Sequence, residues 1–256
     1  MNKHRFVWHD LSTTDAEASK RFYGEVFNWK FDGDKSYWHI KAGDEMIGGI
    51  RQMDANEKQP PNWLGYVVVD DVAKCVETIK GAGGNVFVPP QTMENVGTFA
   101  VTADPTGAVF SPWKSARAGE DVEKTTAPGP FTFVWDELMT TDTDKAGAFY
   151  NKVFGWAAKP QDMGGGMIYN LLERPGTKNP FREGPNAAGG MMKSPMGVSF
   201  WLAYVGVDDC DKRSAHAERL GGKIMVPAQD IPGVGRFACW SDPQGAAIAV
   251  LQPKMP

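Results

Sequence analysis

An internal repeat is the feature of this sequence that most restricts its fold. The segment FYGEVFNW at 22–29 returns as FYNKVFGW at 149–156, and further pairs of segments match in the same order. Because a repeat of this length is far longer than one unit of a solenoid, it predicts two duplicated domains. The other pairs are FVWHDLSTTD at 6–15 with FVWDELMTTD at 133–142, WLGYVVVDD at 63–71 with WLAYVGVDD at 201–209, GGNVFVP at 83–89 with GGKIMVP at 221–227, and VGTFAVTADPTGA at 96–108 with VGRFACWSDPQGA at 234–246.

The repeat also predicts the domain boundaries. Domain 1 is expected at 1–115 and domain 2 at 130–256, joined by a linker at 116–129 whose sequence is polar with Gly and Pro. The second half carries extra residues within ERPGTKNPFREGPNAAGG at 173–190, and their Gly and Pro content predicts a lengthened hairpin loop.

Charge and cysteine content limit the partners. The formal net charge is -4 and the chain has no basic run, which argues against binding to nucleic acid or to an anionic membrane surface. Cys75, Cys210 and Cys239 are odd in number and form no C-x-x-C pair, so free thiols in a cytoplasmic, reducing environment are expected. The partner left is a small molecule, and the sequence is compatible with a monomer or a homodimer.

Each half contains the same order of elements. Strand-forming residues at 5–12 are followed by Thr14 and Glu17, whose spacing predicts a capping box and a helix, and Thr141 with Asp144 repeats this device. The aromatic residues of 22–29 fall on one helical face, which predicts scaffold packing against a sheet. Three strands follow each helix, and DPTG at 104–107 predicts a type I turn between the last two. The pattern therefore predicts an α+β fold with two βαβββ units per domain.

This order, together with FYGEVFNW, VDDVAKCVETIKGAGGNV at 69–86 and ADPTGAVFSPWK at 103–114, resembles the vicinal oxygen chelate superfamily. That superfamily includes glyoxalase I, the bleomycin-resistance proteins and the extradiol dioxygenases, and the chain looks most like its two-domain glyoxalase-like members. The resemblance implies tandem glyoxalase-like domains, each forming a cupped mixed sheet. It implies no single activity, because the superfamily contains lyases, dioxygenases, isomerases and binding proteins.

Family enzymes imply a divalent metal held by His and Glu or Gln side chains in each cup. One ligand position of each domain lies within IGGIRQ at 47–52 in the first half and within AGGMMK at 188–193 in the second. Neither segment contains His, Asp or Glu. We therefore expect no metal and no cofactor in either domain. His4, His9, His39 and His216 share no spacing and are interpreted as surface or strand-packing residues. The other positions that correspond to the family's ligands are Trp8, Leu64 and Ser111 in the first half and Trp135, Leu202 and Ala249 in the second.

Side chains that share a strand face with those positions are expected to line the cups, because successive residues of a strand alternate between faces. Each cup would contain a tryptophan, a tyrosine and one acid on mostly apolar walls, which is the usual composition of a ligand pocket. The candidate ligand-binding residues are Trp8, Tyr66, Ser111, Trp113, Trp135 and Tyr204.

Asp10 and Glu137 are the candidate catalytic residues. Loss of hydration in an apolar cup would make either acid a usable general acid or base. The alternative is that each carboxylate accepts hydrogen bonds from neighbouring elements and serves only the fold.

Three functions remain open. The preferred hypothesis is a metal-independent, bleomycin-resistance-like protein that binds a small hydrophobic or aromatic molecule. The alternative is an enzyme of the superfamily, a glyoxalase-type lyase or isomerase or a dioxygenase, with an atypical site. A third hypothesis is a scaffold whose sheets serve protein contacts and whose cups are filled.

Overall fold

The fold is taken from a computed structural model, which describes residues 4–117, 128–179 and 185–254. Most of the expected linker and part of the expected hairpin loop lie outside these residues. The first half contains β1 (Phe6–Thr13), α1 (Ala16–Phe27), β2 (Lys30–Gly33), β3 (Tyr37–Ala42), β4 (Glu45–Gln52), β5 (Asn62–Val68), α2 (Val72–Gly81), β6 (Asn85–Met93), β7 (Gly97–Ala103) and β8 (Val109–Ser115). The second half contains β9 (Phe133–Thr140), α3 (Thr143–Phe154), β10 (Ala157–Asp162), β11 (Ile168–Glu173), β12 (Ala187–Lys193), β13 (Phe200–Gly206), α4 (Cys210–Arg219), β14 (Lys223–Ile231), β15 (Gly235–Ser241) and β16 (Ala247–Pro253).

Each half forms one eight-stranded mixed sheet. The strand order is β2-β3-β4-β1-β5-β8-β7-β6 in the first half and β10-β11-β12-β9-β13-β16-β15-β14 in the second. In both, the first strand of each βαβββ unit pairs in parallel with the last strand of that unit, as β1 does with β4 and β9 with β12. The predicted α+β fold with two βαβββ units per half is confirmed.

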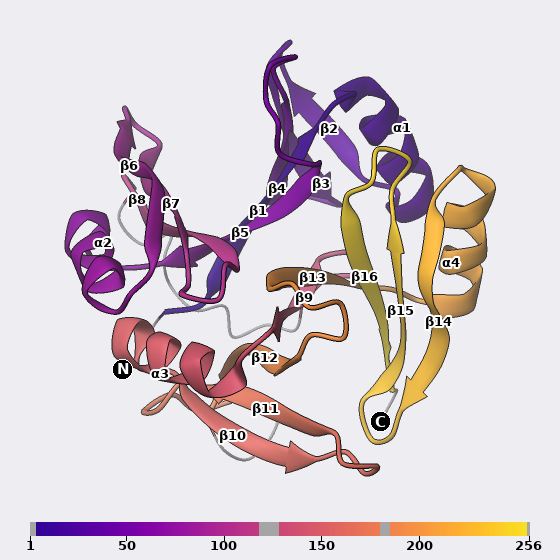
Figure 1. The fold of residues 1–256 in the computed structure, drawn as a ribbon. Helices are drawn as coiled ribbons and strands as arrows, with labels where there is room; N and C mark the ends of the chain where they lie inside the picture. Colours follow the sequence, from indigo (N-terminus) through magenta and orange to yellow (C-terminus); the bar gives the residue numbers. More distant parts are fainter. Residues whose placement is uncertain (1–3, 118–127, 180–184, 255–256) are drawn as a thin grey trace. The chain divides into compact units, whose positions relative to one another are not determined.

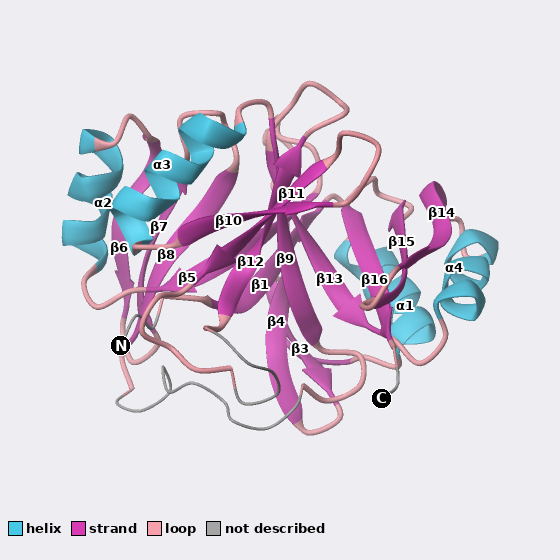
Figure 2. Ribbon diagram, turned by 90° about the horizontal axis from the view of Figure 1, so that it is seen from below, coloured by secondary structure: helices cyan, strands magenta, loops and turns pink. Residues whose placement is uncertain are grey.

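Side-chain packing combines elements from both halves. One compact unit, called unit 1, comprises Met1–Val7, Gly65–Thr126 and Trp135–Trp201, and unit 2 comprises Trp8–Leu64, Ala127–Val134 and Leu202–Pro256. Within unit 1, α2 lies beside α3, and within unit 2, α1 lies beside α4 (Figures 1 and 2). These units follow packing and not chain order, so the domain boundaries expected from the repeat remain a prediction.

The repeated helix begins one residue later than the capping box predicts. Asp15, not Thr14, caps α1, because its carboxylate accepts the backbone N–H of Ala18 at 2.9 Å. Asp142 caps α3 through the N–H of Lys145 in the same way. An Asp at the cap satisfies an N–H that has no partner inside the helix, and its charge suits the positive end of the helix dipole.

The repeated phrase is scaffold, as predicted, and it packs on a turn from the other half of the chain. In unit 2, the Tyr23 hydroxyl donates to Asp242 at 3.1 Å and accepts from the Trp63 indole at 3.2 Å. In unit 1, the Trp201 indole donates to the Tyr150 hydroxyl at 2.9 Å, and Asp104 is the acid beside that phenol. Burial raises the pKa of both tyrosines well above the ordinary value.

Two apolar cores follow from this packing. The core of unit 2 joins the α1 aromatic residues to Trp240 and Ile248, and the core of unit 1 joins Phe110 to the aromatic residues of α3. None of the helices in the described ranges has both the length and the apolar character that a membrane span requires.

Candidate binding site

The first strand of the first half, β1, separates two environments. On β1, His9 and Leu11 turn inward, and His9 is buried in a stack on Phe133 with ring centroids 4.0 Å apart. The alternate residues Trp8 and Asp10 are only partly buried and lie on the other face. The predicted alternation therefore holds, and Trp8 and Asp10 share a face.

A hydrogen-bonded group forms on that face of the first half, and we call Trp8, Asp10 and Tyr37 the first-copy cluster. The Trp8 indole N–H donates to Asp10 Oδ1 at 2.8 Å, and the Tyr37 hydroxyl donates to the same oxygen at 2.8 Å. The indole also lies 3.3 Å from the Tyr37 hydroxyl oxygen. Because two donors from two strands converge on one oxygen, the carboxylate is held in one orientation.

Gly49 makes this arrangement possible. It is the register partner of Asp10 on β4, and a Cβ at this position would lie 2.0 Å from the Tyr37 hydroxyl oxygen and 2.6 Å from Asp10 Oδ1. Any side chain at position 49 would therefore displace the phenol or the acid.

The second half repeats the group as the second-copy cluster of Trp135, Glu137 and Tyr169. The Trp135 indole donates to the Tyr169 hydroxyl at 2.9 Å, and that hydroxyl hydrogen-bonds the Glu137 carboxylate. Gly190 pairs with Glu137 as Gly49 pairs with Asp10, and a Cβ there would overlap the Tyr169 hydroxyl. The duplicated chain thus retains a tryptophan, an acid, a tyrosine and a glycine at matching places, although the indole donates to the acid in the first copy and to the phenol in the second.

The residues next to the two clusters differ. Ser12 is paired with Arg51 in the first copy, and the guanidinium donates to the Ser12 hydroxyl at 3.1 Å. In the second copy, Met139 is paired with Met192. The first-copy site is therefore bordered by a cation and the second-copy site by apolar side chains.

The remaining candidate residues divide between the two units: Tyr66, Ser111 and Trp113 fall in unit 1 with the second-copy cluster, and Tyr204 falls in unit 2 with the first-copy cluster. In unit 1, Tyr66 and Ser111 are register partners, and Tyr66 packs edge-on against Trp113 with ring centroids 6.1 Å apart. The Ser111 hydroxyl is buried and donates to the Ala100 carbonyl at 2.7 Å. In unit 2, Tyr204 lies 5% exposed beside Phe237. Ligand roles for these residues remain predictions.

Tyr37, Tyr169, Arg51 and Glu57, which binds Arg51, did not emerge from the sequence. The repeat contained a signal for the two tyrosines, because each lies in the first two residues of the second strand after the repeated helix. That signal was obscured, since the extra residues of the second half lie between Tyr169 and Gly190 and change the spacing between tyrosine and glycine.

The positions at which the resemblance implies metal ligands do not fit a divalent ion. Trp8 presents an indole N–H that donates to Asp10, and the Ser111 hydroxyl donates to a backbone carbonyl, so neither offers an imidazole or carboxylate lone pair. No three His, Cys, Asp or Glu side chains gather as a metal site would require within the described parts of the chain. The expectation of a metal-free protein stays a prediction, but the donor set argues for it.

The phenols of both clusters are expected to stay protonated well above the ordinary tyrosine pKa of about 10. Burial and the neighbouring acid raise the pKa of Tyr37 and Tyr169. Because the folded state holds these protons more tightly, the stability that they contribute is complete below about pH 10 and declines as the pH rises through the raised values. Tyrosinate absorbance during titration checks this: the native protein should ionise later than the urea-unfolded protein, and superimposed curves would contradict it.

Comparison with known proteins gives matches along both halves. The family model described as Glyoxalase/Bleomycin resistance protein/Dioxygenase superfamily matches residues 5–111 and 132–250. A Mycobacterium tuberculosis protein named "Putative glyoxylase CFP32" is 36% identical over 256 residues, which cover 96% of this chain and 94% of that protein. The anthracycline biosynthesis protein DauV of Streptomyces sp. is 29% identical, with coverage of 96% and 92%.

Solved structures match the fold at low sequence identity. The Mn(II)-bound glyoxalase from Novosphingobium aromaticivorans gives a TM-score of 0.62 at 17% identity, covering 97% of this chain and 81% of that one. The 2,3-dioxygenase LapB from Pseudomonas sp. KL28 gives 0.61 at 14% identity, with coverage of 98% and 93%. At these identities the similarity concerns the fold alone.

Proposed function

Since the chain belongs to the Glyoxalase/Bleomycin resistance protein/Dioxygenase superfamily, we propose that it binds a small hydrophobic or aromatic molecule without a metal at the family's usual positions. The binding surfaces are the first-copy and second-copy clusters, in which an indole supplies flat apolar area and an acid and a phenol supply polar contacts. Affinity would come from burial of the ligand and orientation from the acid and the phenol.

One observation carries this proposal: the hydrogen-bonded group of tryptophan, acid and tyrosine occurs twice, with a glycine opposite the acid each time. Fixed polar groups on a rigid sheet suit the positioning of a ligand hydroxyl or amide. Within the clusters the copies differ in the acid, Asp10 against Glu137, and further differences lie beside them, which fits two sites of one kind with different preferences.

A second candidate function is an enzyme in which Asp10 or Glu137 moves a proton. The relatives that are named as glyoxylase and lactoylglutathione lyase favour it, since both names denote enzymes. The geometry that suits it is an acid hydrogen-bonded to a phenol that burial keeps protonated, because a base needs a held orientation. Under this alternative Asp10→Asn or Glu137→Gln would abolish turnover and leave ligand binding intact.

The proposal is tested by NMR on protein stripped of metal with EDTA and titrated with a panel of neutral aromatic amides and phenols. We expect saturable shifts of the indole N–H resonance of Trp8 or Trp135, assigned with Trp8→Phe and Trp135→Phe. Trp38→Phe is the matched control and should leave the ligand-induced shifts unchanged. The Trp38 ring lies 4.2 Å from the Lys20 ammonium, and Trp38 is the register partner of Ile50. A panel that moves neither resonance, or binding that returns only when a divalent metal is restored, would contradict the proposal.

A further inference from the structure

We infer that Arg51 makes the first-copy site selective for aromatic ligands that carry a carboxylate, and that Glu57 occupies the guanidinium as an internal competitor. This inference rests on the proposed function, because it names the ligand class of one of the proposed sites.

Arg51 lies directly beside the first-copy cluster. Asp10 pairs with Gly49 and, two residues further along both strands, Ser12 pairs with Arg51. Side chains two residues apart on a strand share a face, so Arg51 is on the same face as Gly49 and next to Asp10. A molecule stacked on Trp8 with a polar group at Asp10 would have a guanidinium as its next neighbour.

The guanidinium holds a carboxylate from its own chain. Arg51 donates to both oxygens of Glu57, at 2.7 and 2.8 Å, which is the two-pronged geometry in which arginine binds free carboxylates. The hydrogen bonds from Arg51 lower the pKa of Glu57 to about 2, so the acid is ionised at neutral pH. Glu57 thus occupies the place that a ligand carboxylate would take.

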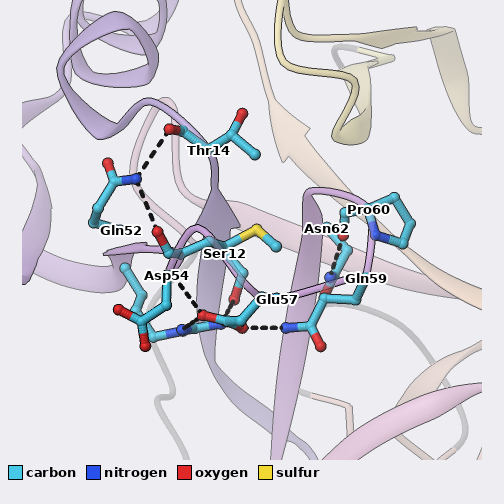
Figure 3. Close-up of polar contacts among 10 residues, drawn as sticks. Ser12, Thr14, Gln52, Asp54, Glu57, Gln59, Pro60 and Asn62 are labelled. Atoms are coloured by element: carbon cyan, nitrogen blue, oxygen red, sulfur yellow. Dashed lines mark hydrogen bonds and ion pairs between the residues drawn. The ribbon is translucent and has the colours of Figure 1, made fainter.

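Glu57 is held by a loop and not by a strand or helix. It lies in the loop at 53–61, between β4 and β5, where its carboxylate also accepts the backbone N–H of Asp54 and the Gln59 amide, each at 2.8 Å (Figure 3). The side chains of Arg51 and Glu57 are 38% and 21% exposed, so water reaches the pair. Because water reaches both groups, a carboxylate from solution can approach the guanidinium and compete with Glu57 for it.

The second half of the chain serves as an internal control for the role of this pair. The positions that match Ser12 and Arg51 are Met139 and Met192, and the corresponding loop at 194–199 contains no Asp or Glu. The same strands therefore form the same sheet without a cation or an internal acid. The sheet does not need the ion pair, so the pair can serve ligand selection.

The test compares benzoate with benzamide, which have similar shapes and differ in charge, using the Trp8 indole resonance as the readout. Glu57→Gln is expected to bind benzoate about tenfold more tightly than the unaltered protein, because the guanidinium is released, and to bind benzamide equally well. Arg51→Met, which installs the residue of the second copy, should remove the preference for benzoate. Met192→Leu is the matched control in the second copy and should change neither affinity.

The outcomes separate this inference from the proposed function. If benzamide shifts the Trp8 resonance but neither Glu57→Gln nor Arg51→Met alters the benzoate affinity, the carboxylate preference is wrong and the binding function stands. If neither compound, nor any other in the aromatic panel, binds any variant, both fail. If Arg51→Met does not fold, Glu57→Gln still decides the matter, since the inference requires it to strengthen benzoate binding and to leave benzamide binding unchanged.

Discussion

Replacing Phe110 with alanine is expected to lower the free energy of unfolding by about 4 kcal/mol, because it removes a large side chain from a closed core. Phe110 is completely buried on β8, and its ring centroid lies 6.2, 5.7 and 5.6 Å from those of Phe149, Tyr150 and Phe154. A strand of the first half thus packs on a helix of the second half. Urea denaturation monitored by tryptophan fluorescence measures the loss.

Phe87→Ala is the matched control for this prediction. Phe87 lies on β6 and is 62% exposed, so the same substitution there should change stability by less than about 0.5 kcal/mol. Similar losses in the two variants would show that Phe110 does not lie in a shared core, and the packing of unit 1 would need revision.

Gly49→Ala is expected to weaken ligand binding at the first-copy cluster by about thirtyfold, since overpacking of this kind costs about 2 kcal/mol. The new Cβ would lie within 3 Å of the Tyr37 hydroxyl oxygen and Asp10 Oδ1, so the phenol and the acid have to separate. Titration of metal-free protein with a neutral aromatic amide, followed at the Trp8 indole resonance, gives the affinity.

Two further variants serve as controls for this prediction. Gly81→Ala makes the same substitution at the end of α2, where a Cβ meets nothing within 4 Å, and should leave the affinity unchanged. Gly190→Ala should weaken binding at the second-copy cluster and spare the first. Unaltered affinity in Gly49→Ala would mean that the cluster is not the site at which the ligand binds.

The fold was predictable because the repeat supplied two copies of each signal. The strand face that carries Trp8 and Asp10 followed from alternation alone, and the aromatic helix followed from spacing as far as Phe27, where α1 ends before Trp29. The cap was misplaced by one residue because Thr14 and Asp15 are both good capping residues and only the geometry shows which carboxylate or hydroxyl reaches the N–H of Ala18.

The candidate site was predictable only in part. A strand pattern tells which residues share a face but not which side chains meet across strands, and so Asp10 was found while its partner Tyr37 was not. The ion pair of Arg51 and Glu57 depends on the path of the loop at 53–61, and the local sequence does not predict that path. The packing of each helix pair across the two halves has no local signal either. A helix that packs within its own half and one that packs on the other half would bury the same residues.

The contact of each repeated helix with a turn of the opposite half has a consequence for inheritance. Asp242 accepts a hydrogen bond from Tyr23, which lies in the other copy of the repeat, so a mutation at Asp242 removes a contact of that copy. Selection for folding therefore acts on the two copies together. The residues beside the two clusters make no such contact, and one copy has Arg51 where the other has Met192. A duplicated gene with this architecture keeps two scaffolds alike while its two recognition surfaces diverge.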